Sequence, residues 1–177
     1  MRSISLSFLF CILINVAFAQ TNSADSIKML SALKTQGDKM ADHLLKKDFK
    51  KFSKYAYPKV IEMVGGVDKM IESMEKSFQE MKADSVIFQS VKIGSPSAIL
   101  KVDGELQCTV PQIIEMKIKG GRLVTNSTLI AISTDKGKNW YFMDTSGKDI
   151  ETMRKYFPNL SSDLIIPAKQ KPTFIAD

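Results

Sequence analysis

The chain has 177 residues, 44% of them hydrophobic and 25% charged, and a formal net charge of +6 at pH 7. That length suits one domain with a real core. The positive charge comes mostly from lysines spread along the chain without interleaved aromatic residues, so nucleic acid is not an expected partner. The only dense group, Lys46, Lys47, Lys50, Lys51 and Lys54, indicates an anionic surface partner or, preferably, a solvated helix face.

The first 19 residues are predicted to be a secretory signal peptide. Arg2 is the only charge before Asp25, Ile4 to Phe18 is almost wholly apolar, and Ala17 to Ala19 matches the small-x-small cleavage pattern. This apolar run is short for a transmembrane span, and no other segment is long enough. We therefore expect a secreted or periplasmic protein, cleaved near Ala19, with no membrane span.

Few residues suited to metal binding or nucleophilic catalysis are present. Without residues 1–19 the chain keeps one cysteine, Cys108, so no internal disulfide is expected, and the apolar neighbours of Cys108 predict a buried, inert thiol. A lone histidine, His43, cannot build a metal site, and the sequence has no calcium-type acidic loop or phosphate-binding glycine loop. We therefore expect neither a metal nor a cofactor, and the catalytic residues remain unknown.

The first half of the chain has helical periodicity. One helix is predicted from Ser23 or Asp25 to about Lys46, and Asp48 is expected to cap a short second helix. The apolar run in Tyr57 to Val64 fits either a buried strand or one turn of helix.

The Gly65-Gly66 break is followed by an amphipathic helix. Its apolar residues recur at three- and four-residue steps: Val67, Met70, Ile71, Met74, Phe78 and Met81. An adaptable methionine-rich binding surface is one interpretation of this stripe, and a core face is the preferred one.

From Asp84 onward the period changes to two, which is typical of strands. Strands are predicted at 86–93, 98–102, 105–118, 123–134 and 139–144, with a strong tight-hairpin signal at Asp103-Gly104. The apolar centre Leu129 to Ile132 is expected to be covered on both faces. A short helix is predicted at Asp149 to Tyr156, and residues 161–177 are expected to cross the domain and end as a loose tail.

Ser133 to Trp140 resembles the Asp-box hairpin of sialidase-like propellers, Ser-x-Asp-x-Gly-x-x-Trp. A propeller needs repeated blades, and this sequence has one copy. The motif is therefore interpreted as a hairpin and not as evidence for sugar hydrolysis.

The order of elements, together with Asp48-Phe49, Tyr57-Pro58 and Gly65-Gly66, resembles the nuclear transport factor 2-like superfamily, also called SnoaL-like or cystatin-like cones, and its small secreted bacterial members. The resemblance covers about residues 23–144. It implies an α+β fold in which N-terminal helices pack on a strongly curved antiparallel β-sheet shaped as a cone. We therefore expect one such domain at 20–160 and a C-terminal tail at 161–177.

That superfamily includes ketosteroid isomerase, scytalone dehydratase and SnoaL-type polyketide cyclases, as well as non-catalytic binding and dimerising domains. None of its catalytic motifs matches residues of this chain. The preferred expectation is an exported non-catalytic domain that binds a small apolar ligand or a protein partner. The alternative is an isomerase or dehydratase with a single acid or base in the cone, for which Tyr57, His43, Glu62 and Asp144 are candidates. A homodimer through the sheet face is a third possibility.

Tyr57, Gln112 and Tyr141 are the predicted ligand-binding residues. Gln112 occupies an alternating row that is otherwise apolar, and the adjacent Pro111 indicates a sheet edge or a bulge where the amide could reach an opening. The two tyrosines would supply aromatic walls. The simpler alternative, which we prefer, is that the Gln112 amide bonds a backbone group at the bulge.

Overall fold

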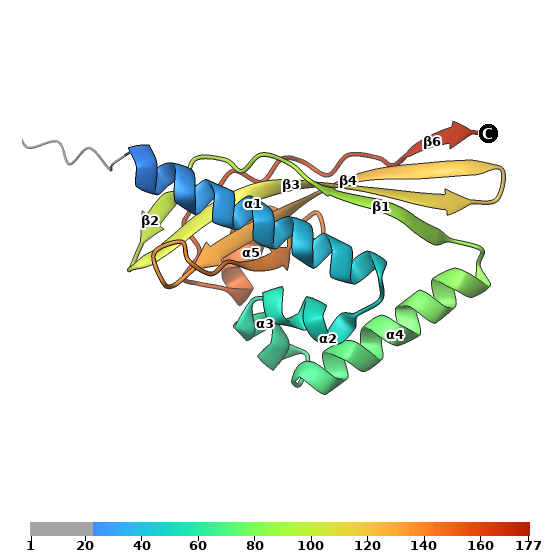
Figure 1. The fold of residues 1–177 in the computed structure, drawn as a ribbon, viewed down its shortest axis with the longest axis horizontal. Helices are drawn as coiled ribbons and strands as arrows, with labels where there is room; N and C mark the ends of the chain where they lie inside the picture. Colours follow the sequence, from blue (N-terminus) through green and yellow to red (C-terminus); the bar gives the residue numbers. More distant parts are fainter. Residues whose placement is uncertain (1–22) are drawn as a thin grey trace, which may run out of the picture.

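The computed structural model describes residues 23–177, so the predicted signal peptide lies outside the described residues. Figure 1 shows the order of elements. The helices are α1 (Ser23–Leu45), α2 (Phe49–Phe52), the 3₁₀ helix η1 (Ser53–Tyr55), α3 (Pro58–Met63), α4 (Val67–Ala83) and α5 (Ile150–Tyr156). The strands are β1 (Ile87–Ile93), β2 (Leu100–Val102), β3 (Glu105–Ile118), β4 (Gly121–Ser133), β5 (Tyr141–Asp144) and β6 (Thr173–Ala176). The predicted α+β class, with helices ahead of an antiparallel sheet, is confirmed.

The sheet is built around the long β3–β4 hairpin. β2 pairs with the N-terminal part of β3 and β1 with its C-terminal part. β6 pairs with the N-terminal part of β4 and β5 with its C-terminal part. All of these pairs, and the β3–β4 pair itself, are antiparallel. Pro111 lies in β3 between the stretch that pairs with β1 and the stretch that pairs with β2. Its missing N–H therefore falls at a local sheet edge, as predicted, while the bulge lies elsewhere, in β1 between Phe88 and Ser90.

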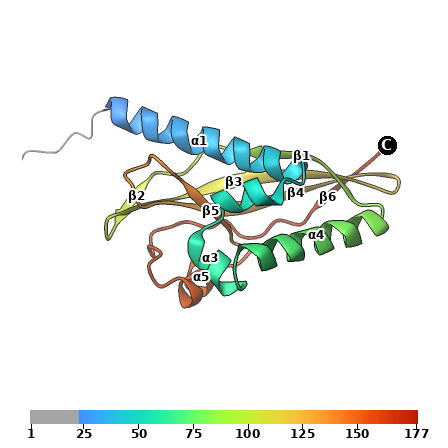
Figure 2. The same cartoon turned by 60° about the horizontal axis from the view of Figure 1, so that its bottom comes forward.

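Each face of the sheet carries its own apolar cluster. On one face α1 packs over the sheet (Figures 1 and 2), and its Leu33, Met40 and Ala41 join strand residues that include Cys108, Val110 and Ala131. Gly37 allows this close approach, since a Cβ there would lie 3.1 Å from Cγ2 of Ile93. On the other face, Ile130 and Ile132 pack with Met153, Phe157, Leu160 and Leu164. The centre of β4 is thus covered on both faces, as predicted.

α4 departs from the expectation of a core face, because none of its residues is buried. Its stripe residues Met70, Ile71, Met74, Phe78 and Met81 are half-buried, and Val67 is exposed. In Figure 1 α4 lies apart from α1, and its C-terminal end leads into β1. α4 contacts α2, η1 and α3, and Phe78 near its C-terminal end contacts Phe88 of β1. Part of its apolar stripe stays accessible.

Leu164 is buried in the second cluster, which agrees with the expected crossing of the domain. The expectation of a loose tail after that crossing is wrong, because β6 pairs with Gly121–Val124 of β4. Gly121 explains the pairing, because a Cβ at that position would overlap the carbonyl oxygen of Ile175. A glycine that looked like a simple turn residue therefore also makes room for β6.

The Asp-box-like segment forms a closed hairpin turn, as interpreted. Ser133 Oγ accepts from Gly137 N at 2.9 Å, and Asp135 Oδ1 accepts from Asn139 N at 2.8 Å. Trp140 is 1% exposed and donates through Nε1 to the Gly137 carbonyl at 3.1 Å.

Among the described helices, none combines the length and the hydropathy that a membrane span requires.

Candidate functional site

A groove with a volume of about 130 Å³ lies where α4 meets β1. Its wall on the helix side is formed by Phe78, Met81 and Lys82, and the facing wall by Val86, Ile87 and Phe88; Leu45 and Lys47 close it at the end of α1. Six of these side chains are apolar. The accessible part of the α4 stripe therefore opens into a small, mainly hydrophobic groove.

Phe78 fixes the geometry of this groove. Its ring stacks on Phe88 with centroids 4.9 Å apart and meets Phe49 edge-on at 5.1 Å. Aromatic pairs of this kind contribute about 0.5–1.5 kcal/mol each beyond burial. These contacts hold α4 at a defined distance from β1, so the groove is a property of the packed fold.

Two lysines give the groove a positive rim. Lys47 Nζ lies 6.0 Å from the centroid of the Phe78 ring, and Lys82 also lines the groove. In the described part of the chain, neither lysine forms an ion pair with a carboxylate. The rim therefore keeps its positive charge.

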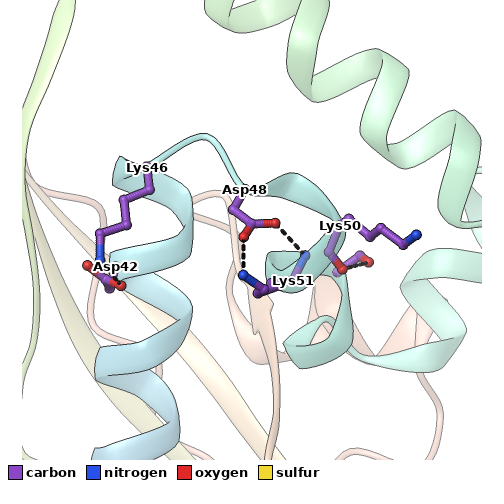
Figure 3. A network of polar contacts seen from close by, with 6 residues as sticks. Asp42, Lys46, Asp48, Lys50 and Lys51 are labelled. Carbon is purple, nitrogen blue, oxygen red and sulfur yellow. Dashed lines mark hydrogen bonds and ion pairs between the residues drawn. The ribbon is translucent and has the colours of Figure 1, made fainter.

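The neighbouring lysines behave differently (Figure 3). Lys46 pairs with Asp42, and Lys51 pairs with Asp48, each at 2.8 Å. The hydrogen bond from Lys51 lowers the pKa of Asp48 below its ordinary value of 3.8. All five lysines of the dense group are exposed, in agreement with the preferred interpretation of a solvated helix face.

The three predicted ligand-binding residues are not brought together. Tyr57 is buried in the second cluster and Tyr141 packs against the same cluster, so these two share one face of the sheet. Gln112 follows the alternation of Cys108 and Val110 onto the α1 face. It is 5% exposed, and its Oε1 accepts from Ser127 Oγ, opposite it on β4, at 3.1 Å. The partner is thus a cross-strand hydroxyl and not a backbone group at a bulge.

Tyr57 belongs to a polar network that sequence reasoning missed. Its hydroxyl oxygen accepts from Asn159 Nδ2 at 3.1 Å, and the same nitrogen donates to Glu105 at 3.0 Å. Gln107, fully buried, donates to the Asn159 carbonyl oxygen and accepts from Ser161 N, both at 2.9 Å. The network fastens the segment after α5 to the sheet. No sequence signal marks it, because its members lie about 50 and 100 residues apart.

The candidate acid–base residues lie apart from one another. His43, near the end of α1, stacks on Tyr55 with centroids 6.0 Å apart. Glu62 and Asp144 are exposed, and Asp144 accepts from the backbone N–H of Ser146. Among the described residues, no hydrogen bond or ring contact joins any two of the four candidates, which include Tyr57. None of the four lines the groove.

Cys108 is completely buried, and this burial raises the pKa of its thiol to about 12. The predicted inert thiol agrees with this environment. Within residues 23–177, no group of three or more histidine, cysteine, aspartate or glutamate side chains is arranged to hold a metal ion.

Comparisons of the chain with protein-family models, with curated proteins and with solved structures find no match.

Proposed function

We propose that this chain is an exported, non-catalytic domain that binds a small amphiphilic molecule, with an apolar chain in the groove between α4 and β1 and an anionic end at Lys47 and Lys82. The observation that carries the proposal is the accessible apolar stripe of α4 beside a positive rim. We also propose that the chain belongs to the nuclear transport factor 2-like superfamily, supported by the helix-first order and the antiparallel sheet.

The size of the groove limits what it can hold. Its volume of about 130 Å³ is below the roughly 300–1,000 Å³ of sites for drug-sized molecules. One unbranched chain end fits such a groove, whereas a fused ring system does not. Because Lys47 and Lys82 are exposed, the charged end of the ligand stays in contact with water.

Isothermal titration with dodecanoate tests the apolar part of the proposal. Ile87 is 55% exposed and lines the groove, so Ile87→Gln removes an apolar contact without opening the core. Ile165 is 77% exposed and lies outside the groove, so Ile165→Gln is the matched control. We expect dodecanoate to bind the unaltered protein and the control alike, and Ile87→Gln to bind it about tenfold more weakly.

A second set of measurements tests whether binding requires the negative charge of the ligand. Dodecanol and dodecyltrimethylammonium share the alkyl chain but lack the negative charge, so we expect both to bind more weakly than dodecanoate. Replacing both Lys47 and Lys82 by Gln should weaken dodecanoate binding about three- to tenfold, whereas the same change at the exposed Lys101 and Lys119 should not. Equal binding of all three amphiphiles, or none by dodecanoate, would contradict the proposal; the second result would leave a protein partner as the occupant to seek.

A further inference from the structure

β6 forms the outer edge of the sheet at the end of the β3–β4 hairpin. It pairs with β4 on one side, and Figure 1 shows no other element of the described chain beyond it. All four of its residues are exposed, with Phe174 at 54% and Ile175 at 37%. An exposed edge with apolar side chains is a template for pairing with another strand.

The backbone of β6 has groups free to make such a pairing. Asp177 N donates to the Gly120 carbonyl oxygen at 3.4 Å, in line with the register that pairs Ala176 with Gly121. Since backbone groups of a strand alternate in direction, Thr173 and Ile175 also bond toward β4, and Phe174 and Ala176 direct their N–H and C=O groups outward.

Protected sheet edges usually carry a lysine, a proline or a bulge within the strand. Thr173–Ala176 has none of these, but Lys171 and Pro172 come directly before it and Asp177 directly after it. Pro172 has the outward orientation of Phe174 and no N–H, so it limits the outward edge to Thr173–Asp177. We propose that β6 pairs antiparallel with β6 of a second copy, which joins two sheets edge to edge around a two-fold axis. A two-fold interface places the same surface on both copies, so this edge must complement itself.

Lys171 and Asp177 make the edge complementary to itself. If the antiparallel pairing is centred on Phe174, Lys171 lies directly opposite Asp177 of the second copy. If it is centred on Ile175, Lys171 lies diagonally across from that Asp177, within reach of a long side chain. Both centres agree with the outward backbone groups of β6. Each copy therefore offers a cation where the other offers an anion. This edge pairing differs from the predicted homodimer through the sheet face.

Sedimentation velocity over about 10 µM to 1 mM suits so short an interface, because small interfaces are weak. We expect the unaltered protein to self-associate in this range. Lys171→Asp and Asp177→Lys should each weaken association about tenfold, since each places like charges together twice per dimer. An equimolar mixture of the two variants should regain association, because one copy then carries two acidic side chains at these positions and its partner carries two basic ones. Lys28→Asp, on exposed α1 surface, is the control and should change nothing.

Phe174→Pro provides a second, independent variant. It removes an outward N–H without removing a bond to β4, so we expect the monomer to stay folded and association to be lost. The proposal is overturned by a protein that stays monomeric throughout this range, or by variants whose mixture associates no better than each alone. Association that persists in Phe174→Pro would place the contact on another surface, such as the sheet face, and would equally overturn it.

Discussion

The Asn159 side chain donates a hydrogen bond of 3.1 Å to the hydroxyl oxygen of Tyr57. Tyr57 is the N-cap residue of α3, and its backbone N–H donates to the Phe142 carbonyl oxygen on β5 at 3.0 Å. Asn159 follows α5 and bonds to Glu105 on β3. One pair of residues thus connects the N-terminal helical part, the sheet and the C-terminal segment, and the surrounding polar network should matter for stability.

Gln107→Ala tests how much that network contributes to the free energy of unfolding. The change leaves the Asn159 carbonyl and the Ser161 N–H without their partner in a buried site, and it leaves a cavity. We expect the free energy of unfolding to fall by about 2–4 kcal/mol, measured by urea denaturation. Gln89→Ala, at an exposed position on β1, should change it by less than about 0.5 kcal/mol. Equal effects of the two variants would show that the network contributes little.

Asp135 should make the hairpin at 133–140 sensitive to acid. Partial burial acts to raise the pKa of Asp135, but hydrogen bonds from Asn139 and Ser133 outweigh it and bring the pKa below its ordinary value of 3.8. A lowered folded-state pKa contributes stability that is present above the unfolded pKa and lost as the pH falls through the folded one.

Asp135→Asn measures this contribution. We expect the variant to be less stable than the unaltered protein by about 1 kcal/mol at pH 7, and the difference to shrink as the pH falls below about 4. Unfolding curves at several pH values give the comparison, with Asp163→Asn at an exposed position as the control. A stability difference that stays constant down to pH 2 would exclude the ionised carboxylate as its source.

Cys108 should react only when the protein unfolds. With Cys11→Ser removing the other cysteine, a thiol reagent at pH 8 meets a fully buried group whose pKa is about 12. We expect slow modification in buffer and complete, rapid modification in denaturant, and the rate in buffer should follow the opening of the fold. Modification in buffer as rapid as in denaturant would contradict the buried assignment.

Apart from α3, the helices and the first five strands were predictable because each has a local signal. α1 has a regular apolar stripe, α5 has Asp149 as its cap, and β3 alternates over most of its length. Pro58 stands at the first turn of α3, where a proline is tolerated, which explains why the ambiguous run after Tyr57 became helix and not strand.

The remaining features depend on contacts between distant residues. The stripe of α4 shows which side of the helix is apolar but not how deeply it is buried, so the groove beside Phe78 was not predicted. β6 has four exposed residues and no alternating pattern, and its partner is set by Gly121 far away in the chain. Alternation placed Gln112 in the row of Cys108, yet it could not show that Tyr57 and Tyr141 lie on the opposite face.

Photo-cross-linking with a diazirine-bearing fatty acid tests most directly whether the groove between α4 and β1 is the ligand site. After irradiation, digestion and mass spectrometry, we expect the label on peptides that contain Phe78–Lys82 and Val86–Phe88, with excess dodecanoate suppressing it. Ile87→Gln should reduce the label and Ile165→Gln should not. Labelling confined to the cluster of Tyr57 and Tyr141, or spread over the surface and unaffected by dodecanoate, would contradict the assignment.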